Sequence, residues 1–336
     1  MAAMSTNRSE SLLYISAWIL LSSIVIVFNK WILDRFPFAI TLTTYHMLFA
    51  TISTQILSRT TSLIEPSPEM CPRFYTKAIL PTGLCFSMSL ILSNKVYLYL
   101  SVSFIQMLKA IGPVATLGAC WSMGIRNPEP SLQVLLTLLV IVCGVAISSL
   151  GELRFVLVGF LIQGAAVLFE AYKNTLQQIL ITGQTRLSTL TLLYYFAPTC
   201  TAFNVIWVLI FELQGLQHRG ASGIGPGIWL LNGVLCFGLN IASVTVIKKT
   251  SSLVLTLSGI PKSILLSSMD MMLYRTPITL VQAIGLSIAA AGTYRYSQLN
   301  SSSTGIIVLD KKKGDAPLYM RVADEESQLQ DEMTQR

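Results

Sequence analysis

Two lysines stand out because each interrupts a long apolar run. Lys109 lies inside residues 103–121 and Lys262 inside residues 253–273, and both runs are long enough to form membrane-spanning helices. A lysine near the centre of a bilayer costs about 2.5–3.5 kcal/mol on insertion scales, so it usually marks an ion or substrate pathway. Few carboxylates lie in the apolar runs to neutralise these two ammonium groups. We therefore expect the missing anion to be the substrate, which predicts a transporter of organic phosphates.

The composition is typical of a helical membrane protein. Hydrophobic residues make up 53% of the 336 residues, charged residues make up 12%, and the mean hydropathy is +0.63. Soluble domains carry roughly 25% charged residues, so this chain is predicted to be a polytopic all-α protein of the lipid bilayer. The basic residues behind the net charge of +7 are scattered singly at the ends of apolar runs, which argues against a nucleic-acid partner. The six cysteines show no CxxC pattern and no histidine at metal-ligand spacing, so no metal site is predicted.

The apolar runs predict ten transmembrane helices. An even number places both termini on one side, and 14 of the 23 Lys and Arg residues fall in loops on that side, against 6 on the other. Because cytoplasmic loops carry the excess of basic residues, both termini are predicted to be cytosolic. The predicted spans cover residues 11–33, 38–57, 78–94, 101–123, 131–150, 155–178, 187–212, 227–247, 252–273 and 277–297.

An internal repeat relates the two halves of the chain. The stretch RNPEPSLQV (126–134) comes after Lys109, and the similar stretch RTPITLVQA (275–283) comes after Lys262. The arginines that begin these two stretches are 149 residues apart. Gly144 and Gly292, in the helices that follow, are 148 residues apart. Five spans per copy is an odd number, so the second copy is inverted, and transporters place their substrate between such repeats. The predicted segments are a cytosolic N-terminus (1–10), a first five-helix repeat (11–150), a second five-helix repeat (151–299) and a disordered cytosolic tail (300–336).

Residues that weaken a helix accompany both lysines. Gly112-Pro113 follows the first lysine, whereas Gly259 and Pro261 precede the second. Proline removes a backbone hydrogen bond, and glycine lets another backbone approach closely. Loosened helices beside a buried charge are typical of a ligand site within the membrane.

A structural role is the alternative for these lysines, by pairing with buried acids or by snorkelling to water. Glu170 and Asp270 are the acids predicted well inside spans, and Glu170 has Lys173 three residues on as a local partner. Asn240 in the eighth span is a candidate for contacts with a base or ribose. The sequence has no Walker loop, HExxH or GxSxG motif, so we predict neither an enzyme nor a cofactor.

Several motifs together resemble the triose-phosphate translocator/nucleotide-sugar transporter family of the drug/metabolite transporter superfamily. The resemblance covers about residues 11–296 and implies ten helices, an inverted five-plus-five repeat and counter-exchange of phosphorylated solutes. The matching stretches are FNKW (28–31), FPFAITLTTYH (36–46), LSNKVYLYLSVSFIQMLKAIGP (92–113), KKTSSLVLTLSGIPKS (248–263) and YRTPITLVQAIGLSIAAAGTYRYS (274–297).

The resemblance also implies roles for single residues. Lys109 and Lys262 match lysines that bind phosphate in the plastid translocators, but the arginine that follows the second lysine there is Ser263 here. Losing an arginine removes a bidentate phosphate clamp, which favours the Golgi nucleotide-sugar branch over a triose-phosphate or phosphoenolpyruvate translocator. An orphan branch that carries another phosphorylated solute fits equally well. The histidine and threonine of the third span that contact phosphate in the plastid proteins align here with Leu90 and Ser93, and the tyrosine-asparagine pair of the eighth span aligns with Leu239 and Asn240.

We therefore expect an antiporter of the Golgi or ER membrane that exchanges a cytosolic nucleotide sugar for a lumenal nucleoside monophosphate. A sugar-phosphate/phosphate translocator is the alternative within transport; an integral-membrane enzyme acting on lipid-linked sugar and a membrane scaffold with a regulatory tail are the others. The sequence leaves a homodimer open. The predicted substrate-binding residues are Lys109, Lys262, Ser263, Ser93, Asn94, Gln106 and Asn240.

Overall fold

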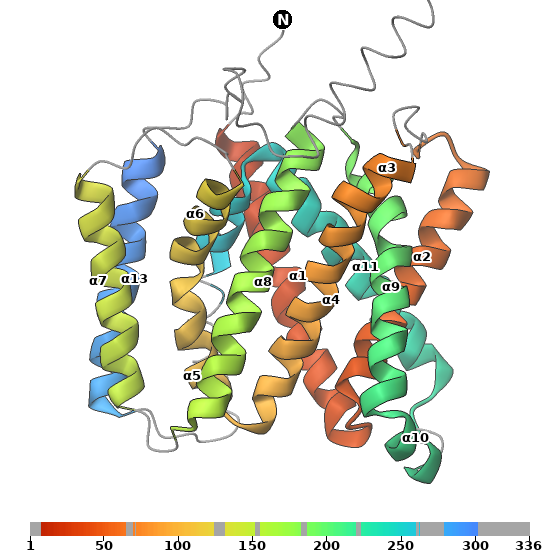
Figure 1. The fold of residues 1–336 in the computed structure, drawn as a ribbon, viewed down its shortest axis with the longest axis horizontal. Coiled ribbons are helices and arrows are strands. Elements are labelled where there is room, and N and C mark those ends of the chain that lie inside the picture. Colours follow the sequence, from red (N-terminus) through yellow and green to blue (C-terminus); the bar gives the residue numbers. More distant parts are fainter. Residues whose placement is uncertain are drawn as a thin grey trace, which may run out of the picture.

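The computed structural model describes residues 8–64, 70, 72–123, 132–151, 155–182, 187–219, 223–259, 262 and 279–301. Every regular element in these ranges is helical (Figure 1). The α-helices are α1 (Arg8–Arg35), α2 (Ala39–Thr60), α3 (Pro72–Phe74), α4 (Leu80–Lys95), α5 (Val102–Leu108), α6 (Gly112–Ser122), α7 (Leu132–Leu150), α8 (Leu157–Thr182), α9 (Thr189–Phe211), α10 (Leu213–Arg219), α11 (Pro226–Lys249) and α13 (Leu280–Ser301). A π-helical turn, η1 (Tyr75–Ile79), joins α3 to α4; η2 (Val96–Leu98) and η3 (Lys109–Ile111) are 3₁₀ turns, and residues 252–259 are helical.

Six helical segments within the described ranges are long and apolar enough to cross a membrane. The prediction of an all-helical chain with membrane-spanning helices is confirmed over these residues. The ten-span inverted repeat stays a prediction, because residues 260–261 and 263–278, which include 13 of the 22 residues of the ninth predicted span, lie outside the described residues. So do Ser263, Asp270 and the predicted tail beyond residue 301.

The fourth predicted span is helical throughout but is not a regular α-helix. It consists of α5, the 3₁₀ turn η3 and α6, and Lys109 is the first residue of the turn. Pro113 occupies the first turn of α6, where its missing N–H is tolerated because that position has no intrahelical partner. Helix α5 ends at Leu108, and the Gly-Pro pair begins α6 one 3₁₀ turn after the lysine.

The helices pack in neighbouring pairs that run roughly parallel across the molecule (Figure 1). Helices α7 and α13 lie together at one edge, α4 packs on α8 near the middle, and α2 packs on α9 towards the opposite edge. Helix α8 also contacts α6, and α1 contacts α11. Helix α8 therefore stands between two groups of helices and can present side chains to both.

Glycines allow α7 and α13 to approach backbone to backbone. A methyl group added at Gly144 would lie 2.5 Å from the Ala289 backbone nitrogen and 2.8 Å from the Gly285 carbonyl oxygen. Close contact through small residues is the usual basis of helix association in membranes, where lipid and apolar side chains compete equally for the helix surface. The outer faces of both helices expose large aliphatic side chains suited to lipid.

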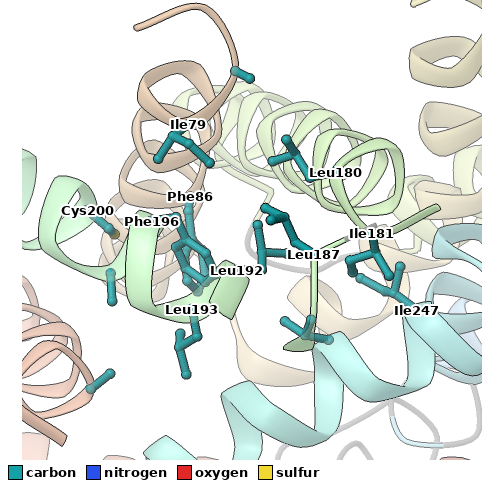
Figure 2. Packing of buried hydrophobic residues seen from close by; sticks show 14 of the residues in the cluster. Ile79, Phe86, Leu180, Ile181, Leu187, Leu192, Leu193, Phe196, Cys200 and Ile247 are labelled. Atoms are coloured by element: carbon teal, nitrogen blue, oxygen red, sulfur yellow. The ribbon is translucent and has the colours of Figure 1, made fainter. Parts of the chain in front are cut away.

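A second packing centre lies between α4, α8, α9 and α11 (Figure 2). Phe86 of α4 and Phe196 of α9 meet there edge to face, with ring centroids 5.4 Å apart. Leu192 and Leu193 are fully buried beside them, and Ile247 closes the cluster from α11. This cluster fixes α8 against α4, which matters because Phe86 also lies under one of the charged residues described next.

Candidate functional site

One cavity gathers charged side chains that the sequence places inside apolar helices. Its volume is ≈ 100 Å³, and its walls come from α1, the α5–α6 segment, α8, α11, residues 255–259 and Lys262. We call it the lysine cavity. The charged residues among its described lining are Lys109, Lys173, Lys262 and Glu170.

Lys109 enters the cavity from the 3₁₀ turn between α5 and α6. Its position at the start of η3 removes it from regular α-helical geometry, and its side chain is half-buried. Thr116 follows two turns later on α6, and its hydroxyl oxygen lies 3.1 Å from that of Thr256. Gly112 makes this crossing close, since an added methyl there would lie 2.8 Å from the Thr256 methyl carbon.

Lys262 is oriented by α1. Its ammonium group donates a hydrogen bond to the Ser22 hydroxyl at 3.2 Å and lies 4.9 Å from the centroid of the Trp18 ring. The Trp18 indole N–H donates in turn to the Ser243 hydroxyl of α11 at 2.8 Å, and Ser243 donates to the Leu239 carbonyl oxygen. The lysine is therefore held by a hydroxyl and an aromatic face, while none of these partners supplies a negative charge.

Helix α8 presents Glu170, Lys173 and Asn174 to the cavity from adjacent turns. Glu170 interacts electrostatically most strongly with Lys109, then with Lys173 and Lys262. Lys173 lies over the Phe86 ring, with its nitrogen 4.7 Å from the ring centroid. Asn174 is 2% exposed, and its Oδ1 atom has no hydrogen-bond partner among the described residues. That oxygen is an acceptor available to a bound solute.

The charges in the cavity do not balance. With ammonium and carboxylate groups in their usual states, the described lining carries three positive charges and one negative charge. An uncompensated charge in a medium of low dielectric is costly, so the arrangement favours binding of an anion. Ammonium groups each offer three rotatable donors, which suits the oxygens of a phosphate.

The structure brings together two of the predicted site residues, Lys109 and Lys262. The other predicted residues that it describes are not among those lining the cavity: Ser93, Asn94, Gln106 and Asn240. The first two lie in the last turn of α4, and Gln106 is 1% exposed within α5. Asn240 donates from its amide nitrogen to the Cys236 carbonyl oxygen at 3.1 Å, within its own helix.

Several cavity residues were not predicted as ligands from the sequence. Lys173 was assigned only as a local partner of Glu170, and Trp18, Ser243 and Thr256 were not singled out. The polar stripe of α8 carried a usable signal, because residues 170, 173 and 174 occupy one helix face at spacings of three and four. Trp18 and Ser243 carried none, since an aromatic and a serine in apolar helices ordinarily pack there.

Comparison with known proteins agrees with this architecture. The model of the Triose-phosphate Transporter family matches residues 9–297. The chain belongs to this family of transporters. As a member of the Triose-phosphate Transporter family, it is a multi-pass membrane protein.

The names of individual relatives give different substrates. Two Arabidopsis thaliana proteins described as probable sugar phosphate/phosphate translocators are 35% and 37% identical to this family member. The first match covers 94% of this chain and 88% of the relative, and the second covers 84% and 82%. UDP-galactose transporter 1 of the same plant is 27% identical, over 85% of this chain and 86% of its own. A solved crystal structure, 15% identical, matches with a TM-score of 0.56 over 89% of this chain and 100% of its own, which concerns the fold alone.

Proposed function

We propose that this protein exchanges small phosphorylated solutes of the sugar-phosphate class across a membrane, with Lys109, Lys173 and Lys262 holding the phosphate. The observation that carries this proposal is the convergence of three ammonium groups on one cavity with a single carboxylate among its described lining. A phosphate dianion supplies the charge that the cavity lacks. Its oxygens can accept hydrogen bonds from all three lysines at once.

Lys173 supports the sugar-phosphate class in a second way. The plastid translocators that this chain resembles carry an arginine directly after the second lysine, whereas this chain has Ser263. Helix α8 delivers a third cation to the cavity from a different element. The loss of the arginine therefore does not reduce the site to two cations, which weakens the reason for preferring a nucleotide sugar.

Size and similarity point the same way. Sites for drug-sized ligands typically enclose ~300–1,000 Å³, whereas the lysine cavity measures ≈ 100 Å³, nearer to the needs of a compact phosphate ester. The relatives described as probable sugar phosphate/phosphate translocators are more similar to this chain than UDP-galactose transporter 1.

The second candidate is exchange of a cytosolic nucleotide sugar for a lumenal nucleoside monophosphate in the Golgi or ER membrane. The missing arginine at Ser263 and the 27% identity to UDP-galactose transporter 1 favour it. It requires the cavity to open further than ≈ 100 Å³ in the loaded state. For either substrate class, we place both termini in the cytosol on the loop-charge bias.

The proposed transport cycle uses the two predicted repeats, residues 11–150 and 151–299. Trp18, Lys109 and Thr116 line the cavity from the first, and α8, Ser243 and Lys262 line it from the second. Rocking of one repeat against the other would open the cavity first to one side of the membrane and then to the other, while the residues that bind the substrate keep their positions. Closure around an empty, positively charged cavity is unfavourable, so each return step needs a bound anion. This accounts for exchange rather than one-way transport.

Reconstituted liposomes test the substrate class. Vesicles preloaded with inorganic phosphate, UMP, GMP or CMP are supplied outside with labelled triose phosphate or labelled nucleotide sugars. We expect uptake of triose phosphate against internal phosphate, and we expect Lys109→Ala and Lys262→Ala each to abolish it and Lys173→Ala to lower it. Lys95→Ala is the matched control, because that lysine is exposed on α4 over the Phe211 ring and lies outside the cavity. Uptake of a nucleotide sugar driven only by one nucleoside monophosphate would instead establish the second candidate.

A further inference from the structure

Glu170 is the one carboxylate among the described residues that line the lysine cavity. A site built only to capture anions would gain from its removal, because a negative charge repels the substrate. The glutamate nevertheless lies where it interacts electrostatically with the lysines of three different segments. Its position therefore indicates that it affects which solutes the cavity binds.

We propose that Glu170 determines the charge of the solute that the cavity accepts. The three ammonium groups and this carboxylate leave the described lining with a net charge of +2. A dianion, such as a sugar phosphate near neutral pH, neutralises this charge when the cavity closes. A trianion, such as 3-phosphoglycerate, leaves an excess negative charge beside Glu170. The inference deepens the proposed function and rests on it.

The physical basis is the cost of residual charge in a closed, poorly solvated space. Coulombic energies between neighbouring charges rise severalfold as the effective dielectric falls from that of water to that of a protein interior. Like charges held together in such a space are costly and so discriminate against the wrong ligand. Glu170 would thus exclude more highly charged solutes, whereas the lysines alone would attract them.

A purely structural role for Glu170 makes different predictions. In that case the glutamate would act only as the partner of Lys173, three residues away on α8. Lys173 has a second anchor in the Phe86 ring, and Glu170 interacts as well with Lys109 and Lys262 from other elements. A structural partner predicts loss of folding or of all transport on substitution, with no change in the selectivity for charge.

The test compares uptake of 3-phosphoglycerate and triose phosphate by the full-length protein in liposomes preloaded with inorganic phosphate, at pH 7. In Glu170→Gln, the net charge of the cavity rises by one, and the ratio of trianion to dianion uptake should rise by about tenfold or more. In Lys173→Gln, the net charge falls by one and the ratio should fall. The double variant Glu170→Gln/Lys173→Gln restores a net charge of +2, and its ratio should return towards that of the wild type.

The outcomes separate this inference from the proposed function. An unchanged ratio in Glu170→Gln, with uptake retained, would overturn the charge role and leave the sugar-phosphate proposal intact. Failure of the wild type to exchange any phosphorylated anion would overturn both. If Glu170→Gln does not fold, the lowered ratio in Lys173→Gln carries the test. If the double variant had the same ratio of trianion to dianion uptake as either single variant, that result would also contradict the inference.

Discussion

The hydroxyl oxygens of Thr116 and Thr256 lie 3.1 Å apart and join the two segments that carry the cavity lysines. Thr116 lies on α6, seven residues after Lys109, and Thr256 lies on the helical segment 252–259, six residues before Lys262. Gly112 faces the methyl carbon of Thr256 at the same crossing. The distance between the two lysines therefore depends on how closely these segments touch.

Gly112→Ala should separate the two segments. The new methyl would lie 2.8 Å from the Thr256 methyl carbon, and overpacking of this kind typically costs about 1–3 kcal/mol. We expect a lower melting temperature in detergent and a marked loss of exchange. Gly118→Ala on the same helix is the matched control, because nothing lies within 4 Å of its added carbon.

A second-site change sharpens this prediction. Thr256→Ser removes the methyl carbon that Gly112→Ala would strike and keeps the hydroxyl that meets Thr116. The double variant should recover both melting temperature and exchange. If Gly112→Ala were harmless, or if Thr256→Ser failed to rescue it, the close crossing would not be what positions the lysines.

Trp18 should control the affinity of the cavity through Lys262. Trp18→Leu removes both the aromatic face beneath the ammonium group and the hydrogen bond to Ser243. A cation–π contact contributes about 0.5–2 kcal/mol, so the KM for exchange should rise by about 2- to 30-fold. Trp18→Phe keeps a ring and should have a smaller effect. An equal rise in KM for Trp31→Leu, an exposed tryptophan with no place in the cavity lining, would contradict this role.

Contact between α7 and α13 should tolerate no added side-chain atom at Gly144. A methyl there would strike backbone atoms of Ala289 and Gly285, which cannot rotate away. We expect Gly144→Ala to destabilise the folded protein by at least about 1–3 kcal/mol, measured as melting in detergent. Gly164→Ala on α8 has open space around it and should leave the melting temperature unchanged. Equal melting temperatures for the two variants would show that the helices shift apart freely.

Glu212 should stabilise the start of α2 from a distant part of the chain. Its carboxylate accepts hydrogen bonds from the backbone nitrogens of Ile40 at 2.9 Å and Thr41 at 2.7 Å, and from the Thr41 hydroxyl at 2.7 Å. A negative charge also complements the positive end of the helix dipole. Glu212→Ala should therefore cost about 1–3 kcal/mol of stability.

Glu212→Gln keeps an acceptor oxygen but loses the charge, so its melting temperature should fall between those of the wild type and Glu212→Ala. Exchange by the protein that remains folded should be unchanged in both variants, because Glu212 is not among the described residues that line the cavity. A loss of exchange without a loss of stability would assign this glutamate a role in transport instead.

Much of the fold could be predicted because its signal is local. Apolar runs of sufficient length identify spanning helices without knowledge of their neighbours, and the predicted spans at 131–150 and 187–212 agree with α7 and α9. The 3₁₀ turn at Lys109 also agrees with the sequence, since glycine and proline weaken a helix wherever they occur. How the helices pair was not predictable, because pairing depends on close fits such as that of Gly144 on α13.

For the candidate site, too, one part could be predicted from the sequence and another part could not. The sequence by itself determined that Lys109 and Lys262 are anomalous, because a charge in an apolar run is costly whatever surrounds it. Only the tertiary structure decided that Lys173 and Glu170 share their cavity while Asn240 and Gln106 do not line it. The reason is geometric: a helix face is defined by its neighbours, so the partners of a polar residue appear only when α1, α6, α8 and α11 are brought together.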